Sequence, residues 1–156
     1  MKTPISRRIF LQSLAFTAGM TMVPALAEPI DRELFGEPAH KVVYQLNRSD
    51  LDYIESILFS VGELLRKYGD DIHLVVTAIG PGIHILARRP GRPVPELVRQ
   101  RVSSLAAYGV SFHACGNTMK SLNWMKEDIL DFAEIVEIGA DDLMRLQEQG
   151  YSYISW

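Results

Sequence analysis

The stretch DIHLVVTAIGPG, residues 71–82, decides the fold of this chain. Its middle part, LVVTAI, is apolar at nearly every position, whereas a strand with one solvated face alternates apolar and polar residues. Continuous apolar runs are typical of strands in parallel sheets that helices cover on both faces. Gly80-Pro81-Gly82 then ends the strand, and these residues predict a tight turn.

Segments with strand and helix patterns alternate along the rest of the chain. Further strands are expected at 40–46, 110–115, 133–139 and 151–155. Apolar residues at three- and four-residue steps predict helices over 51–68 and 97–108, and short helices are expected at 83–88, 117–126 and 140–150. The alternation predicts a three-layer α/β/α domain with a mainly parallel five-stranded sheet.

Residues 1–27 have the features of an export signal. A basic start is followed by an apolar stretch over residues 9–23, and Ala25-Leu26-Ala27 has the small-x-small pattern of a signal peptidase site. SRRIFLQ, residues 6–12, resembles the twin-arginine translocation motif S-R-R-x-F-L-K. The alternative is a membrane-anchoring helix, but the apolar stretch is shorter than the roughly 20 residues that span a bilayer. We therefore expect export by the twin-arginine pathway, cleavage after Ala27 and a periplasmic protein.

Cleavage after Ala27 would leave 129 of the 156 residues, which suffices for one domain with a core. Residues 28–39 hold two prolines and a glycine without periodicity and predict a linker, so the domain is expected over 40–156. Removal of three basic residues changes the formal net charge from −3 to −6. This acidic domain is a poor candidate for binding nucleic acid, and we expect no stable membrane span after cleavage.

The stretch GVSFHACGNTMKS, residues 109–121, holds the single cysteine of the sequence, Cys115. One cysteine cannot form an internal disulfide, so the thiol is either buried and inert or accessible and reactive. Cys115 ends an expected strand, and open parallel sheets bind ligands beyond the carboxyl ends of their strands. Gly116 permits close backbone approach, Asn117 or Thr118 can cap the next helix, and a helix N-terminus stabilises a thiolate.

The order of these elements resembles the DsrE/DsrF-like family over residues 40–155. The resemblance is carried by VVTAIGPGIHIL (75–86), LAAYGVSFHACGNTMKSL (105–122) and EIVEIGADDLMRLQEQGYSYI (134–154). Family members have an α/β/α fold, usually form trimers or hexamers, and several relay sulfur as a cysteine persulfide. The resemblance implies a flavodoxin-like topology class, a homo-oligomer, and Cys115 at the sulfur-accepting position.

Other polar and glycine residues near strand ends are candidates for the same site. We expect Asn47, Gly80 and Gly82 to shape a pocket, and Arg48 either to hold an anionic sulfur species or to be a solvated loop charge. His113 shares a strand face with Cys115, where it would assist the thiol as a base, ligate a metal, or pack as a hydrogen-bonded residue. The sequence lacks four ligands at zinc-site spacing, so we expect no metal and no cofactor.

Two functions from different classes fit these features. The first is an exported sulfur carrier, similar to a sulfurtransferase but without a complete catalytic constellation, that holds a persulfide on Cys115 and exchanges sulfur with a donor or acceptor protein. The alternative is a non-catalytic oligomeric binding module in which Cys115 is buried. In that case GYSYISW (150–156) and Met119–Met125 would form subunit contacts.

Overall fold

The computed structural model describes residues 36–156. The predicted signal peptide at 1–27 and the predicted linker up to residue 35 lie outside these described residues. None of the helices in the described range combines the length and the hydropathy that a bilayer crossing requires.

Five strands form one sheet in the order β4-β3-β2-β1-β5. Their bounds are His40–Leu46 (β1), Ile72–Ala78 (β2), Ser111–Cys115 (β3), Glu134–Val136 (β4) and Ser152–Ile154 (β5). All four strand pairings are parallel, which confirms the expected parallel sheet. The order differs from that of flavodoxin, where the first strand lies between the second and the third. Here β2 lies between β1 and β3, and β5 returns to the far side of β1.

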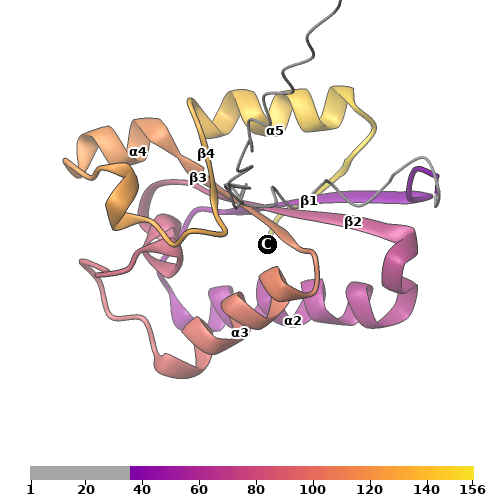
Figure 1. Cartoon of the computed structure of the whole chain (residues 1–156), viewed down its shortest axis with the longest axis horizontal. Coiled ribbons are helices and arrows are strands. Elements are labelled where there is room, and N and C mark those ends of the chain that lie inside the picture. Colours follow the sequence, from indigo (N-terminus) through magenta and orange to yellow (C-terminus); the bar gives the residue numbers. More distant parts are fainter. Residues whose placement is uncertain (1–35) are drawn as a thin grey trace, which may run out of the picture. The chain divides into compact units, whose positions relative to one another are not determined.

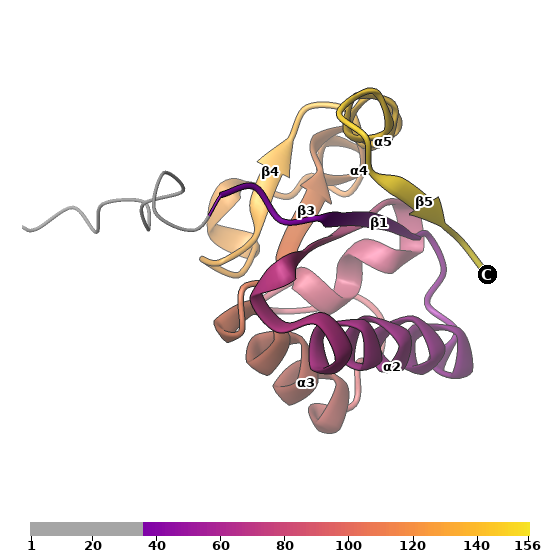
Figure 2. The same ribbon diagram turned by 90° about the vertical axis from the view of Figure 1, so that its right-hand side faces the viewer.

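Helices cover both faces of the sheet, as the apolar run of β2 predicts. Helices α2 (Leu51–Tyr68) and α3 (Glu96–Ala107) lie on one face, and α5 (Gly139–Glu148) lies on the other (Figures 1 and 2). Leu74 and Val76 of β2 belong to the larger core, while Val75 packs with Leu143 of α5. Successive side chains of one strand therefore reach opposite layers, and both find apolar partners.

Local signals explain the ends of α2. Asp50 caps the N-terminus, because its carboxylate accepts a hydrogen bond from the N–H of Tyr53 at 3.0 Å. Gly69 ends the helix with a φ of 55°, a conformation that glycine adopts without steric cost. Both boundaries confirm the sequence prediction of a helix over 51–68.

Two short helices differ from the predictions. The segment expected as a helix at 83–88 is a 3₁₀ helix over Gly80–Leu86. The helix expected at 117–126 is α4, which spans only Gly116–Ser121. It ends because Asn123 takes a left-handed conformation with a φ of 55°, and the N–H of Trp124 then closes on the carbonyl oxygen of Met119 at 2.9 Å.

Candidate functional site

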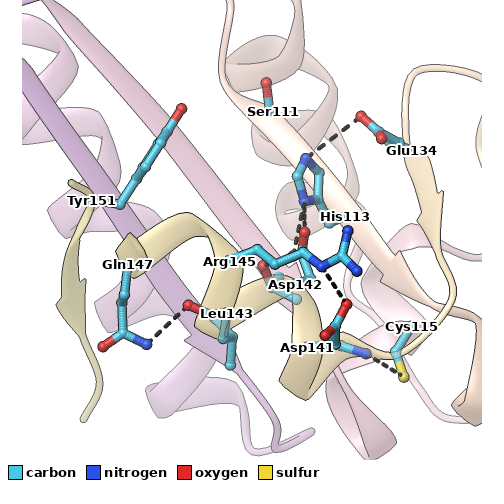
Figure 3. Close-up of polar contacts among 12 residues, drawn as sticks. Ser111, His113, Cys115, Glu134, Asp141, Asp142, Leu143, Arg145, Gln147 and Tyr151 are labelled. Atoms are coloured by element: carbon cyan, nitrogen blue, oxygen red, sulfur yellow. Dashed lines mark hydrogen bonds and ion pairs between the residues drawn. The ribbon is translucent and has the colours of Figure 1, made fainter. Parts of the chain in front are cut away.

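Cys115 is the last residue of β3, and α4 begins at the next residue. The residue is 3% exposed. Like His113, two positions earlier, it lies on the face of the sheet that α5 covers (Figure 3). The thiol is therefore enclosed between the end of β3 and the first turns of α4 and α5.

The N-terminus of α5 points at this sulfur. Gly139 is the first residue of α5, and its N–H donates a hydrogen bond to Cys115 Sγ at 3.3 Å. α5 has ten residues, so its N-terminal amides carry the partial positive charge of a helix dipole. From the sequence, only the helix directly after Cys115 was expected to supply such a terminus. The structure adds a second one from a segment 24 residues further along the chain.

Thr118 links the loop after β2 to the thiol. Its hydroxyl accepts a hydrogen bond from the N–H of Gly80 at 2.9 Å, and the same hydroxyl lowers the pKa of the Cys115 thiol. Gly80 has a φ of 53°, a left-handed conformation that favours glycine at this turn. The structure thus brings the predicted site residues Gly80, Thr118 and Cys115 together at one end of the sheet.

The surroundings of Cys115 shift the pKa of its thiol in two opposite directions. Burial raises the pKa of Cys115, and hydrogen bonds from the Thr118 hydroxyl and from the N–H groups of Thr118, Gly139 and Asn117 lower it. The hydrogen bonds outweigh burial, so the pKa lies below the ordinary value for cysteine. Asn117 is exposed, and its N–H also donates to the carbonyl oxygen of Glu137 at 3.1 Å, so its share in this effect is small. The lowered pKa favours the thiolate, which is the nucleophilic form.

Glycines permit the close approach of the backbone to the sulfur. A Cβ on Gly139 would lie 2.6 Å from Ile79 Cγ1 and 3.1 Å from Cys115 Cβ. A Cβ on Gly116 would lie 2.9 Å from the carbonyl oxygen of Val136. No side chain fits at either position, so α4 and α5 begin this near to β3 and β4 only because both start with glycine.

His113 faces carboxylates with both ring nitrogens. Nδ1 lies 2.9 Å from Oδ2 of Asp142, and Nε2 lies 3.7 Å from Oε2 of Glu134 (Figure 3). The hydroxyl of Thr77 donates to the same Asp142 oxygen at 2.7 Å. This geometry matches the hydrogen-bonded packing role among the three that the sequence left open for His113.

Sequence reasoning missed Thr77, Gly139 and Asp142. Thr77 is the one polar residue inside the apolar run of β2, and this interruption was its only signal. Gly139 and Asp142 belong to the segment EIGADD after β4, whose contact with Cys115 follows from the pairing of β4 with β3.

Asn47 and Arg48 lie at the carboxyl end of β1, and β2 separates this strand from β3. The N–H of Asn47 donates to the hydroxyl of Tyr53 at 3.2 Å, and its side-chain oxygen lies 3.1 Å from that hydroxyl. The Arg48 guanidinium lies 4.0 Å from the centre of the Tyr53 ring and donates to the carbonyl oxygen of Trp156 at 2.7 Å. The structure therefore directs both residues to partners other than Cys115.

Gly82 also packs against the end of β1. A Cβ on Gly82 would lie 2.1 Å from the carbonyl oxygen of Leu46, so this position supports the strand end rather than the sulfur. Within residues 36–156, no three His, Cys, Asp or Glu side chains gather in an arrangement that could hold a metal ion.

Comparisons with known proteins agree with this architecture. The model of the DsrE/DsrF-like family matches residues 40–156. A protein of unknown function from Methanobacterium thermoautotrophicum, MTH1491, has a solved structure with 25% identity and a TM-score of 0.67, and the match covers 75% of this chain and 99% of that chain.

Two more solved structures share the fold. The YchN protein of E. coli has 16% identity and a TM-score of 0.59, with 75% of this chain and 99% of that chain covered. The conserved protein BT1422 of unknown function from Bacteroides thetaiotaomicron has 13% identity and a TM-score of 0.57, with 74% and 94% covered. No curated protein matches the chain.

Proposed function

The chain belongs to the DsrE/DsrF-like family, and on this premise we propose that it carries sulfur as a persulfide on Cys115. The family is associated with sulfur relay. The observation that carries the proposal is the convergence of two helix starts on one sulfur: the N–H of Gly139 in α5 donates to it at 3.3 Å, and Thr118 in α4 lowers the pKa of the thiol. Such donors favour the anionic, nucleophilic form of the thiol.

The proposed transfer requires no redox cofactor. The Cys115 thiolate attacks the terminal sulfur of a polysulfide or of a protein persulfide. A new S–S bond forms at Sγ, the S–S bond of the donor breaks, and the shortened donor departs with that electron pair as an anion. Attack of an acceptor thiolate on the outer sulfur then returns Cys115 to the thiolate, which the same hydrogen bonds stabilise as a leaving group.

The enclosure of Cys115 restricts the donors that suit this step. At 3% exposure, the sulfur admits only a terminal sulfur atom on a slender chain, unless the first turn of α4 or α5 opens. A bulky disulfide would meet the backbone of Gly139, whose N–H lies 3.3 Å from the sulfur and against which Ile79 also packs. We therefore expect inorganic polysulfide, or a persulfide at the tip of a partner protein, as the donor.

The proposal includes export to the periplasm by the predicted twin-arginine signal, and assembly as a homo-oligomer. The support for assembly is a set of exposed apolar side chains on the edge strand β4 and on the segments that flank it in the sequence. These are Leu122, Met125, Phe132, Ile135 and Ile138. An edge strand with such neighbours is a template for association with a second copy. Molar mass from light scattering during size-exclusion chromatography would reveal the assembly, and a monomer would contradict this part of the proposal.

The persulfide is tested by mass spectrometry. The purified protein is incubated with polysulfide, excess reagent is removed, and the intact mass is compared with that of Cys115→Ser treated in the same way. We expect the wild type alone to gain the mass of one sulfur atom and to lose it with a reductant. A wild type that gains no sulfur, or a variant that gains as much, would contradict the proposal.

The burial of Cys115 favours a second candidate function, a non-catalytic oligomeric binding module in which the thiol fills the core. In that case Cys115→Ala would leave every binding property intact. The native thiol would also remain silent toward both polysulfide and alkylating reagents until the protein unfolds.

A further inference from the structure

A polar cluster lies between the sheet and α5, in a layer where apolar contacts would be expected. Its members are Thr77 of β2, His113 of β3 and Asp142 of α5, and Figure 3 labels the last two. Thr77 and His113 are direct partners in the β2–β3 register. Thr77 is fully buried, His113 is 8% exposed, and the side chain of Asp142 is 12% exposed. Buried polar groups whose hydrogen bonds are satisfied within the cluster hold the strands and the helix that carry them in one arrangement.

The cluster is attached to the part of α5 that contacts the thiol. Asp142 lies in the first turn of α5, three residues after Gly139, and its N–H donates to the carbonyl oxygen of Ile138 at 3.0 Å. Its carboxylate accepts from Thr77 at 2.7 Å and lies 2.9 Å from His113 Nδ1. The first turn of α5 is therefore fixed to two neighbouring strands, one of which ends in Cys115.

We infer that Asp142 is a positioning residue for Cys115, because its carboxylate, held by Thr77 and His113, anchors the first turn of α5 and keeps the N–H of Gly139 on the sulfur. The inference deepens the proposed function and rests on it in one respect, that Cys115 is the working thiol. Asp142 acts through Gly139 and does not touch the transferred sulfur.

The direction in which the thiolate fraction of Cys115 changes when Asp142 is replaced distinguishes a positioning role from charge repulsion. A carboxylate near a thiolate disfavours the thiolate by like-charge repulsion, so removal of a negative charge alone would increase the thiolate fraction. Loss of the anchor would decrease it, because the hydrogen bond from Gly139 would weaken. The neighbouring Asp141 is a matched control, since it lies in the same turn but pairs with Arg145 at 2.8 Å instead of with the sheet.

The experiment titrates Cys115 by the ultraviolet absorbance of its thiolate, with Cys115→Ser in the same background subtracted. For Asp142→Ala, we expect the thiolate-to-thiol ratio at neutral pH to fall about fivefold, the size of a partial loss of one hydrogen bond to an anion. Asp141→Ala should leave the ratio unchanged or raise it. Asp142→Asn, which keeps an oxygen for the Thr77 hydroxyl, should restore part of the ratio. Thermal unfolding of each variant reports the structural effect separately.

Two results would overturn the inference: an unchanged or larger ratio in Asp142→Ala, or an equal fall in Asp141→Ala. If Asp142→Ala does not fold, Thr77→Val provides the test, since it removes one anchoring hydrogen bond and preserves the shape of the side chain. We expect a fall of about twofold for Thr77→Val and recovery in Thr77→Ser. No change in Thr77→Val would then reject the role of the cluster.

This titration uses no sulfur donor, so its outcome is separate from that of the persulfide experiment. If the wild type takes no sulfur from polysulfide, the proposed function fails while the effect of Asp142 on the thiolate is still measurable. If the wild type takes up sulfur but the Asp142 variants titrate like the wild type, the positioning inference alone fails.

Discussion

The carboxyl ends of β1 and β3 look alike in sequence and differ in the structure. Each strand is followed by polar residues and a helix, with a four-residue loop (47–50) after β1 and none after β3, where α4 begins at Gly116. At the end of β1, the polar groups of Asn47 contact Tyr53, six residues further along the chain. At the end of β3, the sulfur of Cys115 receives hydrogen bonds from its own helix and from Gly139 of a separate segment.

The difference shows how a stabilising loop is distinguished from a site. In the β1 loop, Asn47 contacts the nearby Tyr53 and Arg48 donates to Trp156, so each residue has its own partner and no common atom gathers them. The β3 end gathers several donors around one ionisable atom whose pKa they lower against the effect of burial. Donors directed at one ionisable group create reactivity, whereas pairwise local contacts create stability.

The largest expected losses of unfolding free energy come from substitutions of the glycines that pack against the carboxyl ends of β1 and β3. Gly82→Ala places a Cβ against the backbone of Leu46 and should cost about 3 kcal/mol of unfolding free energy, with no change in the Cys115 titration. Gly139→Ala should cost about 2 kcal/mol and also lower the thiolate fraction, because the start of α5 must move away from the sulfur. Chemical denaturation and thiolate absorbance measure the two effects. Equal titration changes in both variants would remove the distinction between the two ends.

Tyr53→Phe tests the β1 end alone. The hydroxyl of Tyr53 donates to the carbonyl oxygen of Gln45 at 2.9 Å and accepts from the N–H of Asn47 at 3.2 Å. Its removal should cost about 1–2 kcal/mol of unfolding free energy, since both partners lie at a partly buried strand end. Uptake of sulfur from polysulfide should be unaffected. A loss of uptake in this variant would show that the β1 end takes part in the site.

Thr118→Val tests the β3 end alone. The variant keeps the shape of the side chain but removes the hydroxyl that accepts from Gly80 and lowers the pKa of Cys115. We expect a loss of about 1 kcal/mol in unfolding free energy and a several-fold slower uptake of sulfur at neutral pH. Thr118→Ser serves as the control, because it retains the hydroxyl and should react like the wild type. A Val variant that reacts at the wild-type rate would exclude Thr118 from the site.

The smallest expected effect is a pH dependence of stability. The folded-state pKa of Cys115 is lowered, so the thiolate contributes stability that is fully present above the unfolded thiol pKa of about 8.5. This contribution decreases as the pH falls and disappears below the folded-state pKa. The difference in unfolding free energy between the wild type and Cys115→Ser should therefore increase with pH up to about 8.5. A difference that stays constant or decreases would contradict the lowered pKa.

Most of the fold could be predicted because its signals are local. The apolar run of β2 indicates coverage on both faces, and helix α2 carries its own periodicity, N-cap and terminal glycine. The end of α4 was missed because it depends on Asn123 in a left-handed conformation, and this residue gives no strong signal for a helix end.

The site could be predicted where its residues are consecutive or, as with Gly80, where they follow a strand whose end was visible in the sequence. Cys115, Gly116 and Thr118 form a pattern that is visible in one stretch. Gly139 and Asp142 come from another segment, and their contact with Cys115 and His113 requires knowledge that β4 lies beside β3. The same limit applies to Arg48, because the order of the strands, rather than their number, determines its distance from the thiol.

The most direct test of the account is the titration of Cys115 in the native protein, compared with the same protein unfolded in denaturant. Thiolate absorbance is followed against pH, with Cys115→Ser subtracted in each state. If the donors of α4 and α5 hold the thiolate, the native midpoint lies below the unfolded midpoint. A native midpoint equal to or above the unfolded one would mean that burial prevails over the hydrogen bonds, and that Cys115 is a residue of the core.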